Sequence, residues 1–282
     1  MNALHDVPAP AKLNLFLHVT GRRADGYHLL QSVFMLIDWC DTLHLELRRD
    51  GRIVRRDLGA TLPEDDLIVR AARLLQQASG TPLGADIAID KRIPTQAGMG
   101  GGSSDAASTL LALNRLWQLH LPRSQLEQLG LQLGADVPFF LRGHNAWVEG
   151  IGEQITPVAL PPARFAVIKP ATGVDTASIF RHPQLERATK PATIADFAAD
   201  PYGFGHNDLQ PVAQALCPEV SQALSLLQSQ GLQARMTGSG SAVFAHLATP
   251  GHAAIQAPDH WVVRECGNLE VHPLQGWAAS DN

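Results

Sequence analysis

Pro94-Thr-Gln-Ala-Gly-Met-Gly-Gly-Gly-Ser-Ser-Asp-Ala-Ala107 is a glycine-rich stretch between two segments of regular pattern. Before it, residues 85–90 alternate apolar and polar side chains, which is typical of a half-buried strand. After it, apolar residues recur at helical spacing over 106–117, and Ser103 or Ser104 can cap the predicted helix. The loop therefore leads onto a helix N-terminus, where free N–H groups and the helix dipole favour an anion.

Three interpretations of this loop compete. A tight strand-to-helix turn would use the glycines only for their backbone conformations. A dinucleotide fingerprint needs an acidic residue about 20 positions further on, and no Asp or Glu occurs from Ala106 to Leu126. A Walker A loop needs a Gly-Lys-Ser or Gly-Lys-Thr end, which is also missing. The remaining functional interpretation is a kinase-type phosphate loop without its own lysine, whose glycines let the backbone approach a phosphate.

Composition indicates a globular protein. The 282 residues suffice for one large domain or two smaller ones, and 45% hydrophobic with 17% charged residues argue against disorder. A net charge of −5 without a basic run predicts neither a nucleic acid nor a membrane partner. We expect no secretory signal, and three isolated cysteines favour a reducing compartment, so a cytoplasmic protein is predicted. The twelve histidines lack metal-ligand spacing, and no metal-binding residue is predicted.

Two polar patterns allow both a structural and a functional interpretation. Lys12 and Asn14 share one face of a strand predicted over residues 11–19. On pattern alone, this is an edge strand with a solvated lysine; alternatively, both side chains face a site. Asp136 could cap the next turn, or it could be a catalytic carboxylate. Apolar neighbours would raise its pKa by desolvation, and a nearby lysine would lower it.

The loop Gly98-Met-Gly-Gly-Gly-Ser-Ser-Asp-Ala-Ala107 resembles the phosphate-binding motif of the GHMP kinase superfamily. Four further motifs resemble its branch that acts on 4-diphosphocytidyl-2-C-methyl-D-erythritol. They are Pro8-Ala-Pro-Ala-Lys-Leu-Asn-Leu-Phe-Leu17, Arg23-Ala-Asp-Gly-Tyr-His28, Gly134-Ala-Asp-Val-Pro-Phe139 and Thr237-Gly-Ser-Gly240. The matches stay in order from residue 8 to about residue 247. One position departs from the pattern, because Gln96 stands where the family loop usually has a glycine.

The resemblance implies an α+β fold of two domains, the first like the second domain of ribosomal protein S5, with the active site in the cleft between them. Prolines at 157–162 mark a candidate boundary. We therefore expect an N-terminal GHMP kinase domain with the phosphate loop at 1–158 and a C-terminal GHMP kinase domain at 159–282. The tail from about Gln275 is expected to be mobile.

The resemblance also implies an activity. It is the ATP-dependent phosphorylation of the 2-hydroxyl of 4-diphosphocytidyl-2-C-methyl-D-erythritol, which gives ADP and the 2-phosphate. The reaction belongs to the non-mevalonate (methylerythritol phosphate) route to isoprenoid and terpenoid precursors. Mg²⁺ is expected with ATP and keeps most of its waters, so few protein ligands are needed. The partner is thus a small molecule, and the sequence gives no oligomeric state.

Site residues follow from the same resemblance. Asp136 would orient or deprotonate the hydroxyl, and Lys12 would lie beside it and offset negative charge. Substrate contacts would come from Asn14, Tyr27, His28, Thr176 and Phe180, with Phe180 opposite Tyr27 across the cytosine; on pattern alone Phe180 could equally be a core residue. The ATP-binding residues would be Pro94, Thr95, Gln96, Ala97, Gly98, Met99, Gly100, Gly101, Gly102, Ser103 and Ser104.

Two other functions remain compatible with parts of this pattern. A GHMP kinase for homoserine or a mevalonate-type alcohol would keep the loop but not Gly26-Tyr-His28. A nucleotide-dependent binding or regulatory protein would not need both Lys12 and Asp136. The presence of all these residues favours an enzyme with a cytidine-containing substrate.

Overall fold

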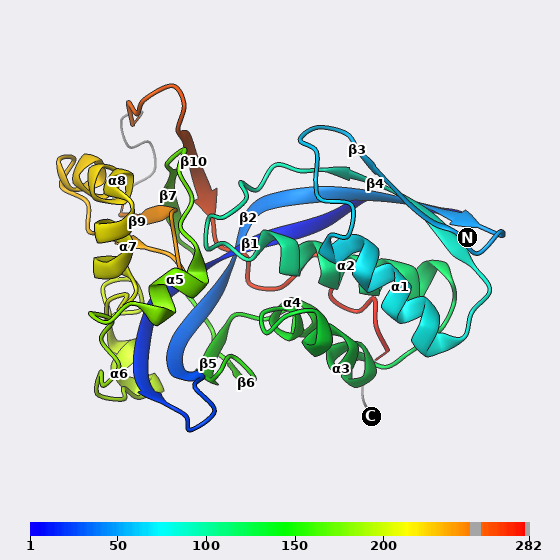
Figure 1. Ribbon diagram of the computed structural model, residues 1–282, viewed down its shortest axis with the longest axis horizontal. Coiled ribbons are helices and arrows are strands. Elements are labelled where there is room, and N and C mark those ends of the chain that lie inside the picture. The colour runs from blue at the N-terminus through cyan, green and yellow to red at the C-terminus, as the bar shows by residue number, and fades with distance from the viewer. Residues whose placement is uncertain (249–254, 280–282) are drawn as a thin grey trace.

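The computed structural model describes residues 1–248 and 255–279, which form two sheets with helices packed on them (Figure 1). The first sheet has the order β3-β4-β2-β5-β6, with β1 paired to β2, and only β3 and β4 are parallel. Its strands are β1 (Ala3–Arg22), β2 (His28–Arg48), β3 (Ile53–Asp57), β4 (Gly84–Asp90), β5 (Ala146–Gly150) and β6 (Gln154–Pro157). The antiparallel second sheet, in the order β10-β7-β9-β8, consists of β7 (Arg164–Lys169), β8 (Ala234–Met236), β9 (Val243–Leu247) and β10 (Val262–Gly267).

Helices of the first half pack on the first sheet, and most helices of the second half pack on the second. The first set is α1 (Leu67–Ser79), α2 (Gly101–Leu116), α3 (Arg123–Leu133) and α4 (Val137–Arg142). The second set is α5 (Thr176–Arg181), α6 (Ile194–Ala199), α7 (Gln210–Leu216) and α8 (Pro218–Gln228). Of these, α5, α7 and α8 pack on the second sheet, whereas α6 contacts β1 and β5 of the first sheet through Phe197. The predicted α+β class is confirmed. Within the described residues, no helix is long and apolar enough to cross a bilayer.

Three buried clusters show how the two sheets are layered. The first lies between the first sheet and helices α1, α2 and α4. The second lies between the second sheet and helices α5, α7 and α8. The third joins the sheets to each other, because strand side chains alternate between faces: Phe165 and Val167 of β7 enter this cluster, whereas Ala166 and Ile168 enter the second. Apolar burial of this kind is the main force that holds such layers together.

Strand β1 serves both halves of the molecule, and a bulge sets the direction of its side chains. Val7 and Ala9 face the helix-side cluster, whereas Leu13 and Leu15 face the cluster between the sheets. The register against β2 shifts between Pro10 and Lys12, so the parity of inward and outward positions changes there. After the shift, Lys12 is placed on the helix side of the strand, near the beginnings of α2 and α4. The predicted strand over 11–19 is confirmed, and it is longer than expected.

The helix after the glycine-rich stretch begins earlier than predicted. It starts at Gly101 rather than Ala106, and its N-cap is Gly100 rather than Ser103 or Ser104. The predicted start was too late because glycine has a low helix propensity, and the prediction did not include the tertiary packing that compensates for it. The consecutive strands β2 and β3 flank Asp50-Gly51 but are not paired to each other, because β4 lies between them.

The C-terminal segment returns to the first half of the molecule. Leu274 and Ala278 are buried in the helix-side cluster, and Ala279 forms a bridge with Pro122 at the start of α3 (Figure 1). The expected mobile tail is therefore wrong for residues 275–279, since apolar contacts hold them. The boundary at 158 stays a prediction; the chain leaves the first sheet at Pro157 and enters the second at Arg164.

Candidate active site

The glycine-rich loop is held in place by the turn at residues 237–241, which joins β8 and β9. The amides of Ser241 and Ala242 each donate to this loop, to the carbonyls of Gln96 and Ala97, at 3.2 Å in both cases. Gly98 has a φ of +71°, and a Cβ there would lie 2.3 Å from the Thr237 carbonyl oxygen. The close approach of the two loops therefore requires glycine at position 98.

Gln96 occupies a backbone conformation that glycine adopts more easily. Its φ is +51°, in the left-handed region that side chains disfavour. The family pattern usually has a glycine at this position, and the structure gives the physical reason. The glutamine side chain lies against Gly173, where a Cβ would approach its Oε1 to 2.2 Å.

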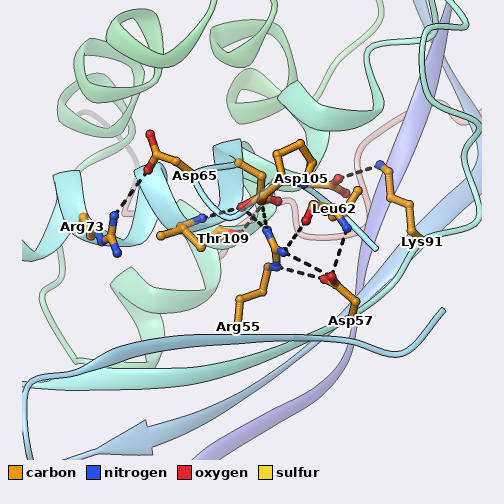
Figure 2. A network of polar contacts seen from close by, with 11 residues as sticks. Arg55, Asp57, Leu62, Asp65, Arg73, Lys91, Asp105 and Thr109 are labelled. Atoms are coloured by element: carbon orange, nitrogen blue, oxygen red, sulfur yellow. Dashed lines mark hydrogen bonds and ion pairs between the residues drawn. The ribbon is translucent and has the colours of Figure 1, made fainter. Parts of the chain in front are cut away.

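A cavity of about 570 Å³ opens in front of the loop. Residues 94–103 line one side, and residues 62–67 with Asp105 line much of the rest. The segment 62–67 is fixed by Arg55, whose guanidinium pairs with Asp57 and Asp66 at 2.9 Å and donates to the Leu62 carbonyl at 3.0 Å (Figure 2). The first N–H groups of α2 have no partners inside the helix and can bind an anion in this cavity.

Lys91 supplies a fixed cation beside that helix N-terminus. Its ammonium pairs with Asp105 at 2.6 Å (Figure 2) and also lies at short hydrogen-bond distance from Asp41. Burial alone would lower the pKa of Lys91, but Asp105 and Asp41 together raise it, so the lysine keeps its charge. Because Asp105 belongs to α2 and Lys91 follows β4, this pair ties the two elements that flank the loop.

Lys12 and Asp136, the two residues predicted to be catalytic, lie close together in the structure. The Lys12 ammonium lies 3.5 Å from the Asp136 carboxylate, with the lysine side chain 5% exposed and the aspartate 32% exposed. Burial lowers the pKa of Lys12, and the neighbouring Asp136 opposes that shift. Lys12 also lies 4.3 Å from the centre of the Phe34 ring. Its backbone N–H donates to the Met99 carbonyl at 3.0 Å, which couples this strand to the glycine-rich loop.

Asn14 orients Lys12 through a chain of hydrogen bonds. The Lys12 ammonium donates to Asn14 Oδ1, and Asn14 Nδ2 donates to Ser32 Oγ at 2.8 Å. Ser32 in turn donates to the Phe16 carbonyl at 2.5 Å, so its lone pairs face the amide of Asn14. All three side chains are buried, and the direction of the Asn14 amide is fixed.

A further cavity of about 660 Å³ lies beside His28 and Phe180. The two rings are 5.0 Å apart at an angle of 32°, and the Tyr27 side chain lines the same cavity while the residue is 62% exposed. Thr176 lies nearer the glycine-rich loop, with its hydroxyl 2.7 Å from that of Ser239. The arrangement of Phe180 opposite Tyr27 across a base stays a prediction.

The cavities join into one groove through a smaller cavity of about 250 Å³ that contains Lys12, Asn14 and Asp136. This central cavity shares Gly98, Gly100, Thr176 and Ser239 with the cavity at the loop. On its other side it shares Leu30, Ile151 and Phe180 with the cavity at Tyr27. Lys12 and Asp136 therefore lie between two spaces, each large enough for part of a ligand.

The structure brings almost all predicted site residues to this groove. Ser104 is the exception: it is fully buried, outside the residues that line the loop cavity. Sequence reasoning missed Ser32, Lys91 and Arg187, whose contacts join residues far apart in the chain. Only Lys91 gave a signal, as a cation directly before the loop. Across residues 1–248 and 255–279, no cluster of three or more His, Cys, Asp or Glu side chains could hold a metal ion.

Comparison with known proteins agrees with this geometry. Residues 66–144 match the family model "GHMP kinases N terminal domain", and residues 191–257 match "GHMP kinases C terminal". A 4-diphosphocytidyl-2-C-methyl-D-erythritol kinase of Paracidovorax citrulli is 65% identical over 286 residues, covering 100% of both chains. One of Polaromonas naphthalenivorans is 64% identical and covers 98% of this chain and 97% of its own. The chain belongs to the 4-diphosphocytidyl-2-C-methyl-D-erythritol kinase family, within the GHMP kinases.

Solved structures of this superfamily share the fold. A crystal structure of 4-(cytidine 5'-diphospho)-2C-methyl-D-erythritol kinase is 36% identical, has a TM-score of 0.78 and covers 92% of this chain and 98% of that one. Homoserine kinase from Cytophaga hutchinsonii is 16% identical with a TM-score of 0.70, covering 96% of each chain, and is similar in fold alone. The predicted GHMP kinase fold is confirmed. As a GHMP kinase, the protein is a small-molecule kinase that uses ATP.

Proposed function

We propose that this enzyme transfers the terminal phosphoryl group of ATP to the 2-hydroxyl of 4-diphosphocytidyl-2-C-methyl-D-erythritol. The products are ADP and the 2-phosphate, in the methylerythritol phosphate route to isoprenoid precursors. The observation that carries the proposal is the continuous groove, with Lys12 and Asp136 between its two end cavities. A nucleotide at one end and a cytidine at the other would meet at this pair.

The loop cavity fits the phosphates of ATP. Its floor is backbone of the glycine-rich loop, and the N-terminus of α2 directs N–H groups and the positive end of its dipole into it. We propose that residues 94–103 hold the nucleotide in this way. ATP would supply the phosphoryl group, and the Mg²⁺ expected with it would offset charge on the phosphates.

Asp136 and Lys12 would act on the acceptor hydroxyl. The Asp136 carboxylate is partly exposed in the central cavity, where it can accept a hydrogen bond from the hydroxyl and hold its oxygen toward the loop. Lys12 pairs with the Asp136 carboxylate at 3.5 Å and would offset negative charge that develops nearby. Phosphoryl transfer depends mainly on such positioning and charge stabilisation.

The cavity at Tyr27 would bind the cytidine end. His28 and Phe180 form its inner aromatic wall, and Tyr27 lies at its exposed side. Aromatic rings can stack on a pyrimidine with favourable contact area. Asn14 and Thr176 line the central cavity, where the linking part of the substrate would lie.

We also propose a cytoplasmic location. The three cysteines are free, and burial raises the pKa of the Cys40 thiol to about 11 and that of Cys266 to about 12. Thiols held protonated in this way are stable in a reducing compartment.

Phosphorus NMR of the purified protein with Mg-ATP tests the proposed reaction. Three acceptors are compared in parallel: 4-diphosphocytidyl-2-C-methyl-D-erythritol, homoserine and mevalonate. We expect a new phosphomonoester signal with the cytidyl substrate alone. A product from another alcohol would overturn the proposed substrate, and ATP binding without transfer to any acceptor would indicate a binding protein.

A further inference from the structure

Arg187 is hydrogen-bonded to His28 and to Phe180, two of the three aromatic residues that line the cavity at Tyr27. Its Nε donates to the ring nitrogen Nε2 of His28 at 3.1 Å. One Nη2 hydrogen bond, of 3.1 Å, reaches the carbonyl of Phe180, and a second, of 2.8 Å, reaches that of His182. Nη1 donates to the Leu185 carbonyl at 2.9 Å. A guanidinium is suited to this role, because its donors have a fixed planar geometry.

These bonds join the two halves of the molecule. His28 is the first residue of β2 in the first sheet, whereas Phe180 is in the last turn of α5 in the second half. The cationic side chain also satisfies carbonyls at the C-terminal end of that helix, where positive charge is favourable. Arg187 therefore sets the spacing of two aromatic walls that no continuous element connects.

Arg187 also determines the protonation of His28. A guanidinium only donates hydrogen bonds, so Nε2 of His28 must accept and the ring hydrogen must lie on Nδ1. Burial lowers the pKa of His28, and the positive charges of Arg187 and Arg22 lower it further. The remaining charged residues that line this cavity are Asp25 and Arg181. A neutral ring in one tautomer gives the cavity a fixed hydrogen-bonding surface.

We propose that Arg187 is a positioning residue for the cytidine end of the substrate, because it fixes His28 and Phe180 in the spacing that a base requires. This inference rests on the proposed function, in which the Tyr27 cavity takes the cytosine. Arg187 would act through the two aromatic residues, far from the phosphoryl-transfer pair. Its loss should affect binding of the cytidyl substrate and leave binding of ATP unchanged.

Steady-state kinetics of the full-length Arg187→Gln variant test this role. We expect the KM for the cytidyl substrate to rise by about tenfold or more, the equivalent of one or two lost hydrogen bonds, while kcat and the KM for ATP stay close to wild type. Arg187→Lys keeps the charge but loses the planar fork, and its KM should be intermediate. Lys190→Gln, an exposed charge change in the same segment outside the cavity, is the matched control.

A second readout follows His28 directly by NMR. In Arg187→Gln the pKa of His28 should rise, because the adjacent positive charge is gone. If Arg187→Gln leaves the KM for the cytidyl substrate unchanged, or leaves the pKa of His28 unchanged, the proposal is overturned. So would an equal rise in both KM values, which would indicate a general structural role.

Calorimetric titration with the cytidyl substrate separates this inference from the proposed reaction. If wild type binds the substrate without turnover and Arg187→Gln binds it more weakly, the reaction is wrong and the role of Arg187 stands. If wild type turns the substrate over and the variant binds it equally well, the proposed reaction stands and the role of Arg187 is wrong. If wild type does not bind the substrate, both fail.

Discussion

Lys12 is a buried lysine whose charge depends on its neighbours. Asp136, the amide oxygen of Asn14 and the Phe34 ring compensate the buried ammonium. Removing a partner from such a group leaves an uncompensated charge, so these residues should behave as a unit. Two substitutions separate the contribution of charge from that of orientation.

Asp136→Asn removes the carboxylate while keeping the side-chain shape. We expect kcat to fall by about 10²–10⁴-fold because the neutral amide cannot take a proton and accepts a hydrogen bond from the substrate hydroxyl more weakly than a carboxylate does, with ATP affinity largely unchanged. The pKa of Lys12 should fall further, since Asp136 now raises it. Turnover assays, ATP calorimetry and NMR of the lysine measure these effects. A kcat near wild type would exclude a catalytic role for Asp136. Asp6→Asn, at a side chain that is 87% exposed, is the control.

Ser32→Ala tests orientation. Without the hydroxyl, Asn14 Nδ2 and the Phe16 carbonyl lose their partner, which should cost about 1–3 kcal/mol of folding free energy. The Asn14 amide can then turn, and we expect kcat to fall by about 10–100-fold as Lys12 shifts. Ser32→Thr keeps the hydroxyl and should restore much of kcat. Ser229→Ala, at an exposed hydroxyl, is the control, and an unchanged kcat in Ser32→Ala would refute the role of this hydrogen-bond chain.

At the scale of elements, the glycine-rich loop and helix α2 form one unit with β1. Gly100, the N-cap of α2, has a φ of +69°, and a Cβ there would lie 3.0 Å from the Phe140 ring and 3.2 Å from Lys12 Cγ. The start of the helix and the position of Lys12 are therefore set by the same close packing. Any side chain at position 100 would disturb both.

Gly100→Ala should therefore raise the KM for ATP and lower kcat, beyond its effect on stability. Gly231→Ala is the matched control, because Gly231 has a φ of +76° and no atom within 4 Å of an added Cβ. Both variants should lose about 1–2 kcal/mol from the strain of a left-handed residue. Chemical denaturation and steady-state kinetics compare them. Equal kinetics in the two variants would show that packing at Gly100 has no part in the site.

Sequence patterns predicted helices and strands well where neighbouring residues alone determine them. The strands predicted at 85–90 and 11–19 both depend on the alternation of neighbouring residues and are confirmed. The early start of α2 was missed because its first turn is stabilised by distant contacts. Arg187 and His28 are 159 positions apart, and no periodicity links such a pair.

At the scale of the whole molecule, β1 and the C-terminal segment tie the two halves together. β1 contributes Val7 and Ala9 to the helix-side cluster, and Leu17 and Val19 to the cluster of the second half. The C-terminal segment brings Leu274 back to the first half. The clusters that β1 and the C-terminal segment enter could not be predicted from sequence, because they depend on how apolar surfaces far apart in the chain pack together.

Leu274→Ala should destabilise the protein by about 2–5 kcal/mol, because it removes buried apolar contact and leaves a cavity. We expect one cooperative unfolding transition at a lower denaturant midpoint, since both halves share clusters. Denaturant unfolding followed by fluorescence and circular dichroism measures the change. Leu131→Ala, at a residue 53% exposed, should have little effect. A stability equal to wild type would show that the C-terminal segment is dispensable for folding.

The shared walls of the three cavities also matter for inhibitor chemistry. A compound that fills the cavity at Tyr27 and extends past Lys12 and Asp136 can reach the glycine-rich loop without leaving the groove. Two weak binding groups joined in this way gain from the high effective concentration of the second once the first is bound. The narrow central cavity favours a slender linker, and an acidic group on that linker would meet the Lys12 ammonium.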